Sequence, residues 1–465
     1  MVVHYLKHKS LFLWLLIYLI SLGLTLNNTI PYKGDESYYL VSALNMVKSG
    51  NYFVPYYYNQ PRFQKPVLPY WITFFGYKLF GIHLWSGRFF FLIFAIFLLI
   101  LIYKFSLLIL DHRKFAFLNV VILSSSTMFI LFSRAAMTDL LLTFFSVLSL
   151  YYFYNSLIQP SKLKRYYLYA YISMGFAFLS KGWAGVFPVI AWLIYLVLIK
   201  PENYIKYIYN LFHPLYIIIF CAIAFSWYLY IFLSPYKKIF LSQLKVESTG
   251  KLSINFKLIL KKFVYYTGVL IRCYFPFTLI GAYLYIKQKV KFPPLVKFLL
   301  IYFSVIFLSY TFLISMYRSR YLLPVFPAIT LITGFIFYKS NLIKKMKRIA
   351  IVIFTLQAIA LLTVPIIRNE PVKEIAEYVR SKKYKDFSAY NIDTRNLGWL
   401  LIFTGGEVRK FTGKNRYVLI KEDDYNKFSR DYTIEKEGVK LKKIKFENKR
   451  IKKIFKKFLL LRRVK

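Results

Sequence analysis

The sequence predicts an all-α polytopic membrane protein with a small α/β domain at its C-terminal end, and three observations lead to this class. Of its 465 residues, 58% are hydrophobic and 21% aromatic, more than a soluble domain of this length buries in its core. Apolar runs of about 18 residues or more recur along most of the chain, each long enough to cross a bilayer as a helix. Lys and Arg gather in the short gaps between those runs.

Eleven membrane spans account for the apolar runs. We expect them at 10–27, 86–110, 115–133, 138–158, 166–180, 183–199, 211–233, 263–286, 295–316, 320–338 and 349–367. The first run follows Lys7, His8 and Lys9 and lacks a small-residue cleavage site. We therefore interpret it as a retained span and not as a signal peptide that is removed.

The basic gaps between the spans set the expected topology. If the N-terminus is cytoplasmic, the positive-inside rule is obeyed by the basic gaps at 112–114, 162–165, 200–206, 287–291 and 344–348. The outer segments are then 28–85, 134–137, 181–182, 234–262 and 317–319. These outer segments hold nearly every motif described below, so we expect a plasma (inner) membrane protein whose working face lies outside.

The first outer segment, 28–85, is too long and too aromatic for a simple connector. The apolar spacing of Leu40, Val41, Leu44 and Val47 predicts a short helix that lies on the membrane surface. We therefore expect a transmembrane domain over 1–367 that includes this structured loop.

From Arg368 onward the composition turns polar. A strand is expected at Tyr417–Ile420 and a helix at Val372–Ser381, followed by a basic tail from Lys440. The range 368–465 is therefore predicted to be a small extracytoplasmic α/β domain.

The formal net charge of +46 would suggest a nucleic-acid partner in a soluble chain. Here the cations sit beside membrane spans and in the C-terminal segment, where topology and anionic lipid headgroups explain them, so we expect membrane lipids and no nucleic acid as partners. The basic tail either lies solvated beside the membrane or binds an acidic acceptor. Cys221 and Cys273 have no partner at metal-ligand spacing, which argues against a disulfide framework or a Cys-based zinc site.

Two outer segments after the first span carry charge. The sequence GDESYY places Asp35 and Glu36 just beyond the span, where carboxylates either anchor a helix end or serve a site. The sequence PRFQKPVLPYW combines Arg62 and Lys65 with three prolines. Two cations on a rigid loop suit a phosphate group, and the alternative is an interfacial belt of snorkelling cations.

Three further charged segments lie at span ends. Asp139 in SRAAMTD begins an apolar run, where an unpaired carboxylate costs several kcal/mol, so it should face the protein interior and pair with a cation. Arg134 is the closest cation in sequence, and a purely structural pair is the alternative. Lys181 lies in LSKGWAG. Arg320 and Tyr321 lie in RSRYLLPVFP, where flanking cations are also ordinary.

Taken in order, GDESYY, FQKPVLPYW, LFGIHLWSGR, SRAAMTD, LSKGWAG and SRYLLPVFP resemble the motif series of bacterial GT-C glycosyltransferases. These are related to the dolichyl-phosphate-mannose protein mannosyltransferases and to the aminoarabinose transferase that modifies lipid A. The resemblance covers roughly residues 10 to 367. It implies a GT-C fold and transfer of a sugar, with inversion, from an undecaprenyl or other polyprenyl phosphate to a lipid, glycan or protein acceptor outside the membrane.

The same resemblance implies roles for the charged residues. Asp35 matches the catalytic carboxylate of the first loop, with Glu36 beside it. Lys65 and Lys181 match cations that hold the lipid phosphate, and Arg134 with Asp139 matches a charged pair. The candidate catalytic residues are therefore Asp35, Glu36 and Asp139, and the candidate donor-binding residues are Arg62, Lys65, Arg134, Lys181, Arg320 and Tyr321.

The chain departs from the aminoarabinose transferase at its metal site. Where that enzyme has a Glu before the motif Lys, this chain has Gln64, and a later Glu-His pair is replaced by Glu247-Ser248. The position of Tyr38, basic in that enzyme, also differs, and His83 is the one histidine expected outside. The motifs require no cofactor, and a divalent metal is left open.

A multispan transporter of a lipid-linked or anionic substrate is the alternative from another class, because many spans and intramembrane charges suit it as well. Against it, the chain shows no inverted halves, and its charges cluster at one face instead of the midplane.

Overall fold

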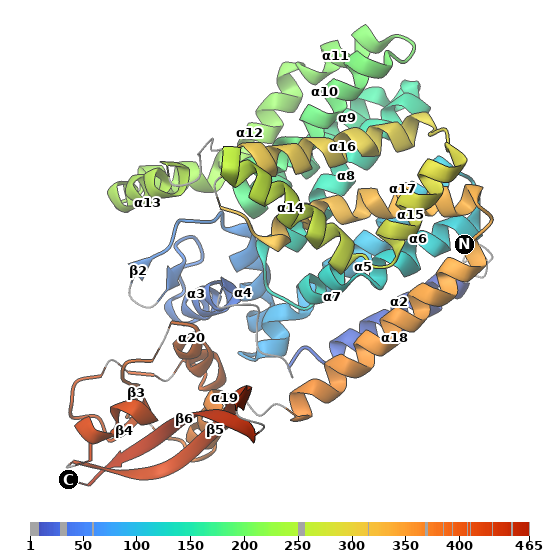
Figure 1. Ribbon diagram of the computed structural model, residues 1–465. Coiled ribbons are helices and arrows are strands. Elements are labelled where there is room, and N and C mark those ends of the chain that lie inside the picture. The colour runs from blue at the N-terminus through green and yellow to red at the C-terminus, as the bar shows by residue number, and fades with distance from the viewer. Residues whose placement is uncertain are drawn as a thin grey trace. The chain divides into compact units, whose positions relative to one another are not determined.

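The computed structural model describes residues 9–27, 35–57, 60–249, 256–314, 316–367, 371–384, 386–392, 394–406, 408–409, 411–429, 431–447 and 450–464 (Figure 1). Contacts divide the chain into two compact units. Unit 1 comprises Met1–Gly23, Pro61–Trp71 and Phe90–Ala358, and unit 2 comprises Leu24–Gln60, Ile72–Phe89 and Ile359–Lys465. The first outer segment is thus shared between the units, and most of it groups with the C-terminal segment.

Unit 1 is helical. Its elements are α2 (Lys9–Gly23), α6 (Arg113–Ser124), α7 (Thr127–Ser133), α8 (Thr138–Ile158), η2 (Pro160–Lys162), α9 (Leu163–Lys181), η3 (Gly182–Val186), α10 (Phe187–Ile199), α11 (Tyr204–Leu211), α12 (Pro214–Leu233), α13 (Lys237–Thr249), α14 (Phe256–Cys273), α15 (Phe277–Gln288), α16 (Pro294–Phe312), η4 (Ser319–Val325) and α17 (Phe326–Lys339). Three helices run across the division between the units: α4 (Leu68–Phe80), α5 (Leu84–Ile109) and α18 (Ile343–Ile367).

The apolar helices confirm a polytopic membrane protein. Over the described residues, seven helical stretches are long and apolar enough to cross a membrane, or up to nine if each of two bent pairs forms one span. The 40-residue stretch Pro160–Ile199 contains two of the predicted spans, and α2 has only 15 residues. The predicted number of eleven spans is therefore not confirmed, although every predicted span coincides with helix.

Two predicted spans are sharply bent. Between α6 and α7 the axis turns by 72°, and the hydroxyls of Ser124 and Ser125 donate to the carbonyls of Val121 and Ile122 in the last turn of α6. Such bonds compete with the helix ladder. Between α14 and α15 the turn is 103°, and Pro276 there lacks the N–H that a continuing helix needs.

The N-terminal helix α2 packs inside unit 1. Trp14 Nε1 donates to Ser124 Oγ over 2.9 Å, and the hydroxyls of Tyr18 and Ser133 lie 2.9 Å apart. Phe354 of α18 contacts both aromatic rings. These buried contacts tie α2 to α6, α7 and α18.

Unit 2 contains a mixed sheet and three of its own helices. The helices are α3 (Asp35–Ser49), α19 (Pro371–Ser381) and α20 (Thr394–Phe403), with the short η5 (Glu422–Lys427). The sheet has the order β3-β4-β6-β5, from strands β3 (Phe387–Ala389), β4 (Tyr417–Lys421), β5 (Tyr432–Glu447) and β6 (Arg450–Arg463). The β3–β4 pair is parallel and the other pairs are antiparallel, and a separate pair joins β1 (Tyr56–Tyr57) to β2 (Gln60–Pro61).

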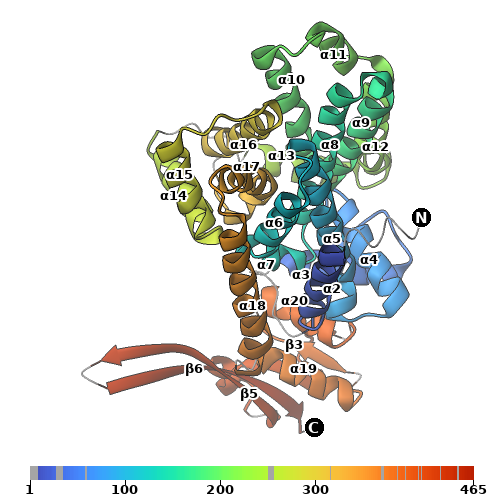
Figure 2. The ribbon, with the colours of Figure 1, turned by 90° about the vertical axis from the view of Figure 1, so that its right-hand side faces the viewer.

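Two elements of the predicted α/β domain are confirmed and two expectations are corrected. The strand at 417–420 is β4 and the helix at 372–381 is α19. The segment from Lys440 is no tail, because β5 and β6 pair as a long hairpin up to Glu447 and Arg450 (Figure 2). The predicted surface helix of the first loop, α3, is buried within the protein on most of its faces. The domain boundary at 367/368 stays a prediction.

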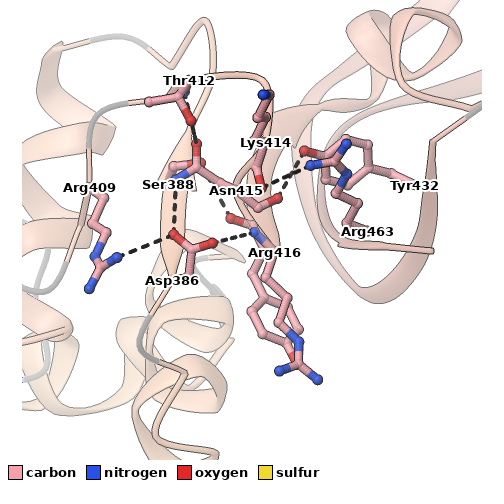
Figure 3. Close-up of polar contacts among 10 residues, drawn as sticks. Asp386, Ser388, Arg409, Thr412, Lys414, Asn415, Arg416, Tyr432 and Arg463 are labelled. Carbon is pink, nitrogen blue, oxygen red and sulfur yellow. Dashed lines mark hydrogen bonds and ion pairs between the residues drawn. The ribbon is translucent and has the colours of Figure 1, made fainter. Parts of the chain in front are cut away.

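A polar network fixes the loop that enters β4 (Figure 3). Asp386 accepts hydrogen bonds from Arg416 N over 2.7 Å and from Asn415 Nδ2 over 3.0 Å. Tyr432 on β5 donates its hydroxyl to the Asn415 carbonyl over 2.9 Å, and Arg463 on β6 donates to the Lys414 carbonyl over 3.1 Å. One carboxylate and the two long strands therefore hold a single loop.

Candidate functional site

The polar centre of unit 1 is built around Asp139, in the first turn of α8. Its carboxylate is fully buried, and Lys181 Nζ donates to its Oδ1 over 2.6 Å. Arg320 Nε lies 3.9 Å from its Oδ2. The positive end of the α8 dipole adds to the favourable charge around the carboxylate. One buried anion is thus shared by two cations from different elements.

Tyr321 completes this group, which we name the Asp139 cluster and define as Asp139, Lys181, Arg320 and Tyr321. The ammonium of Lys181 lies 4.5 Å from the centroid of the Tyr321 ring, which stacks on Tyr310 of α16 at 5.0 Å. An ammonium over an aromatic face is attracted by the ring quadrupole. The side chains of Lys181 and Arg320 remain 9% and 13% exposed.

Glycines in LSKGWAG allow Lys181 to end α9 at this place. Gly182 follows with a φ of +71°, a backbone conformation that glycine adopts without strain. At Gly185 a Cβ would lie 2.3 Å from the backbone nitrogen of Phe178. The chain therefore turns back directly against the backbone of α9, which no larger residue permits.

The loop with Arg62 and Lys65 is anchored by the residue between them. Phe63 is buried and contacts the rings of Trp227 in α12 and Phe240 in α13. Gln243 of α13 accepts from Phe63 N over 2.8 Å and donates to the Pro61 carbonyl over 2.9 Å. Two hydrogen bonds and an aromatic contact therefore fix the backbone of this loop in unit 1.

Arg134 directly follows α7 as its C-cap residue, is 4% exposed, and precedes α8 by four residues. The sequence correctly predicted that Asp139 faces the interior beside a cation, and it named Arg134 as the nearest. The ion pairs recorded for Asp139 join it to Lys181 and Arg320. The partners thus come from segments far away in sequence.

The two carboxylates of the first loop lie in unit 2 and differ in environment. Asp35 is the first residue of α3 and is half-buried. Glu36 is fully buried, and its Oε1 and Oε2 accept from Arg88 Nε and Nη2 over 2.7 and 2.9 Å. Arg88 also donates to the Leu26 carbonyl over 2.6 Å. This geometry favours a structural role for Glu36 in place of the predicted catalytic one.

Sequence reasoning missed two residues that shape these sites. Arg88 lies at the end of LFGIHLWSGR, beside an apolar run. A cation in such a place needs an anionic partner, and this need was the signal in the sequence that could have identified it. Gln243 lies in the polar segment before α14, where nothing in the sequence connects it with the backbone of Phe63. Of the predicted residues, the structure brings Asp139, Lys181, Arg320 and Tyr321 together.

No group of three or more His, Cys, Asp and Glu within the described ranges is placed to hold a metal ion. Glu247 and Ser248, at the position of the metal-site departure, have side chains outside the described part of the structure.

Comparison with known proteins connects this architecture to a family. Residues 64–231 match the family model of the dolichyl-phosphate-mannose-protein mannosyltransferases. An uncharacterized protein of Aquifex aeolicus is 30% identical over 353 residues, which cover 73% of this chain and 65% of that protein. The undecaprenyl phosphate-alpha-4-amino-4-deoxy-L-arabinose arabinosyl transferase of Wigglesworthia glossinidia brevipalpis is 31% identical over 191 residues, which cover 40% of this chain and 33% of that enzyme. The chain therefore matches less than two thirds of either relative.

The fold is similar over nearly the whole chain to a solved structure. The crystal structure of ArnT from Cupriavidus metallidurans bound to undecaprenyl phosphate superposes with a TM-score of 0.74 and covers 97% of this chain and 98% of that protein, at 13% identity. At that identity the likeness shows the fold. The chain thus has the GT-C fold of a polytopic membrane protein, and parts of its sequence are similar to the protein mannosyltransferases and to the undecaprenyl-phosphate aminoarabinose transferases.

Proposed function

We propose that this protein is a membrane glycosyltransferase that uses a polyprenyl-phosphate sugar as donor, with undecaprenyl phosphate as the carrier. The observation that carries the proposal is the Asp139 cluster, in which a buried carboxylate holds two partly exposed cations beside an aromatic ring. The guanidinium fork of Arg matches the geometry of a phosphate, and Lys binds phosphate as a point charge. The names of the related transferases and the bound lipid of ArnT support the same donor class.

In the proposed reaction an acceptor hydroxyl attacks the anomeric carbon of the donor sugar from the side opposite the phosphate. The new acceptor–carbon bond forms as the carbon–phosphate oxygen bond breaks, which inverts the anomeric centre and releases the lipid phosphate. Lys181 and Arg320 stabilise the negative charge that develops on the leaving phosphate. Asp35 takes the proton of the hydroxyl as general base, and Arg62, Lys65 and Arg134 bind the donor. If the acceptor is a phosphate, Asp35 orients it instead.

The proposal includes an acceptor on the outer face of the plasma membrane, in the form of a lipid, glycan or protein. The transferred group is a hexose or a pentose. Basic gaps between the spans support this orientation, because Lys and Arg near span ends favour the cytoplasmic side.

The test is sugar transfer from a panel of radiolabelled undecaprenyl-phosphate sugars in membranes. We expect Asp35→Asn to lower the turnover by a factor of about 10² to 10⁴, as for loss of a general base. Lys181→Met should lower it by about 10² to 10³, as for loss of one charge-stabilising donor. Lys164→Met, at the exposed opposite end of α9, is the matched control and should keep wild-type turnover.

Each outcome of this panel has a meaning. Turnover that is equal in wild type and Asp35→Asn removes this carboxylate from the chemistry. Wild-type protein that is inactive with every donor while it binds undecaprenyl phosphate or carries it across vesicles favours a transporter.

A further inference from the structure

Two glycines bring the backbone of helix α20, and of the turn after it, against side chains of α3, within unit 2. At Gly398 a Cβ would lie 2.7 Å from Ser37 Cβ and 3.1 Å from its Oγ. At Gly406, just past the end of α20, a Cβ would lie 2.9 Å from Leu44 Cδ2 and 2.6 Å from Lys48 Nζ. The segment 398–406 therefore follows α3 along most of its length, from Ser37 to Lys48.

This contact is closer than ordinary side-chain packing. A separation below 3.0 Å between two carbon atoms lies inside their van der Waals radii, so even an alanine at position 398 forces α20 away from α3. Gly406 is also the glycine of the turn after α20, with a φ of +83°. Gly398 is therefore required by the close approach to α3, and Gly406 by that approach and by the conformation of the turn.

Other elements of the C-terminal segment hold α20 in place. Leu400 and Trp399 are buried, α19 packs against α20, and α20 connects the parallel strands β3 and β4. Helix α19 packs on β5 and β6 as well as on α20. The sheet therefore sets the position of α20 through α19, and α20 transmits it to α3.

The other anchor of α3 is Glu36. Its bidentate pair with Arg88 joins the first turn of α3 to α5, and the bond from Arg88 to the Leu26 carbonyl joins it to the segment after α2. Asp35 directly precedes this anchor, and Ser37, which contacts Gly398, directly follows it. The candidate base thus lies at the helix end that two separate contacts hold.

We infer that α20 of the C-terminal domain is a positioning element for the reaction: its contact with Ser37 through Gly398 sets the place of Asp35. This inference rests on the proposed function, because it assigns a task to α3 only if Asp35 acts in transfer. The inference gives the C-terminal domain a part in the turnover step. A domain that is only attached to the transmembrane helices would have no such part.

The experiment is a size-swap cycle at the contact. Gly398→Ala adds a methyl group that Ser37 has no room for, and Ser37→Gly removes the atoms that it meets. We expect Gly398→Ala to lower kcat about 100-fold with little change in the KM for the donor, because misplacement by about 1 Å has this effect on a reacting group. The double variant should recover most of the kcat of Ser37→Gly.

A second readout separates positioning from stability. The acid limb of the pH profile of kcat should shift in Gly398→Ala and return in the double variant, because the surroundings of the base change. Gly268→Ala in α14 is the matched control, since a Cβ there meets open space, and it should keep wild-type kcat.

Several results overturn the inference. They are an unchanged kcat in Gly398→Ala, a loss carried by KM alone, or a folded double variant that stays inactive while Ser37→Gly is active. Where Gly398→Ala does not accumulate in the membrane, the comparison of Ser37→Gly with the double variant decides. The proposed function is judged separately, by wild type against Asp35→Asn: if these two are equal, the function itself is wrong.

Discussion

At the scale of single residues, ion pairing distinguishes two adjacent carboxylates that look alike in the sequence. Asp35 and Glu36 follow each other, and both suit a site at a membrane boundary. The structure commits Glu36 to Arg88, 52 residues away, in a bidentate pair. Sequence reasoning missed this pair because helix packing decides which distant side chains meet. For the same reason it predicted a cation beside Asp139 and yet missed the contribution of Lys181.

Asp139→Asn should destabilise the protein as well as lower its activity. Removing the anion leaves Lys181 and Arg320 close together in a buried place, and breaking a buried ion pair costs about 3–5 kcal/mol. Thermal unfolding in detergent measures the effect. The double variant Asp139→Asn with Lys181→Met should be more stable than Asp139→Asn alone and should remain inactive in transfer. If the two residues acted independently, the second substitution would not restore stability.

Asp386 should make the stability of unit 2 depend on acid pH. The hydrogen bond from Arg416 N, with help from Asn415 and Arg409, holds the pKa of its carboxyl below the ordinary 3.8. A carboxyl whose pKa is lower in the folded state stabilises the fold above the ordinary pKa, and this contribution disappears as the pH falls below about 4. The thermal midpoint of unfolding should therefore decrease as the pH falls below about 4.

Asp386→Asn tests this linkage. It should lower the stability at pH 7 and weaken the dependence on pH below about 4. Asp423→Asn, at an exposed carboxylate of η5, is the control and should follow wild type. A wild-type pH dependence that Asp386→Asn leaves intact contradicts the assignment.

At the scale of elements, hydropathy predicted where helices lie and not how they bend. A window of apolar residues has the same sum whether its axis is straight or turns by 72° or 103°, so the breaks at α6–α7 and α14–α15 were not predicted. The hairpin of β5 and β6 was missed because its many lysines hide the alternation that marks a strand. Helix α3 was predicted, but its burial depends on α20, which the loop sequence does not reveal.

Strand β6 should control the folding of the C-terminal sheet. It pairs with both β4 and β5, and its Leu459 and Leu461 lie in the core cluster with Val418. Leu461→Asp places an unpaired carboxylate in that core at a cost of several kcal/mol. Limited proteolysis should then cleave the segment from 371 to 464 rapidly, while Val464→Asp, at a residue that is 59% exposed, should stay resistant.

At the scale of the whole molecule, the fold class followed from composition and the motif order, because both are summed over many residues. The division into units did not follow, since it depends on contacts between the first loop and the C-terminal segment. The predicted number of eleven spans is not confirmed, because the 40-residue helical stretch Pro160–Ile199 counts once in the structure and holds two of the predicted spans. Long-range contacts are thus the part that a single sequence conceals.

The proposed orientation is tested by labelling single cysteines in a background with Cys221→Ser and Cys273→Ser. Lys414→Cys, on the exposed loop before β4, should react with a membrane-impermeant maleimide in intact cells. Lys344→Cys, at the start of α18, should react only after lysis, since the gap at 344–348 is expected inside. The reverse pattern would place the C-terminal domain in the cytoplasm.

The position of β6 also determines when the C-terminal sheet can close during synthesis. In sequence it follows β3, β4 and β5, and yet it is an interior strand of the sheet, between β4 and β5. The sheet therefore cannot close until β6 has been synthesised, and α19, which packs on β5 and β6, supports α20 only then. Helix α3 is synthesised long before α20, the helix that it packs against. A nascent chain that stalls before β6 thus contains α3 without a supported partner.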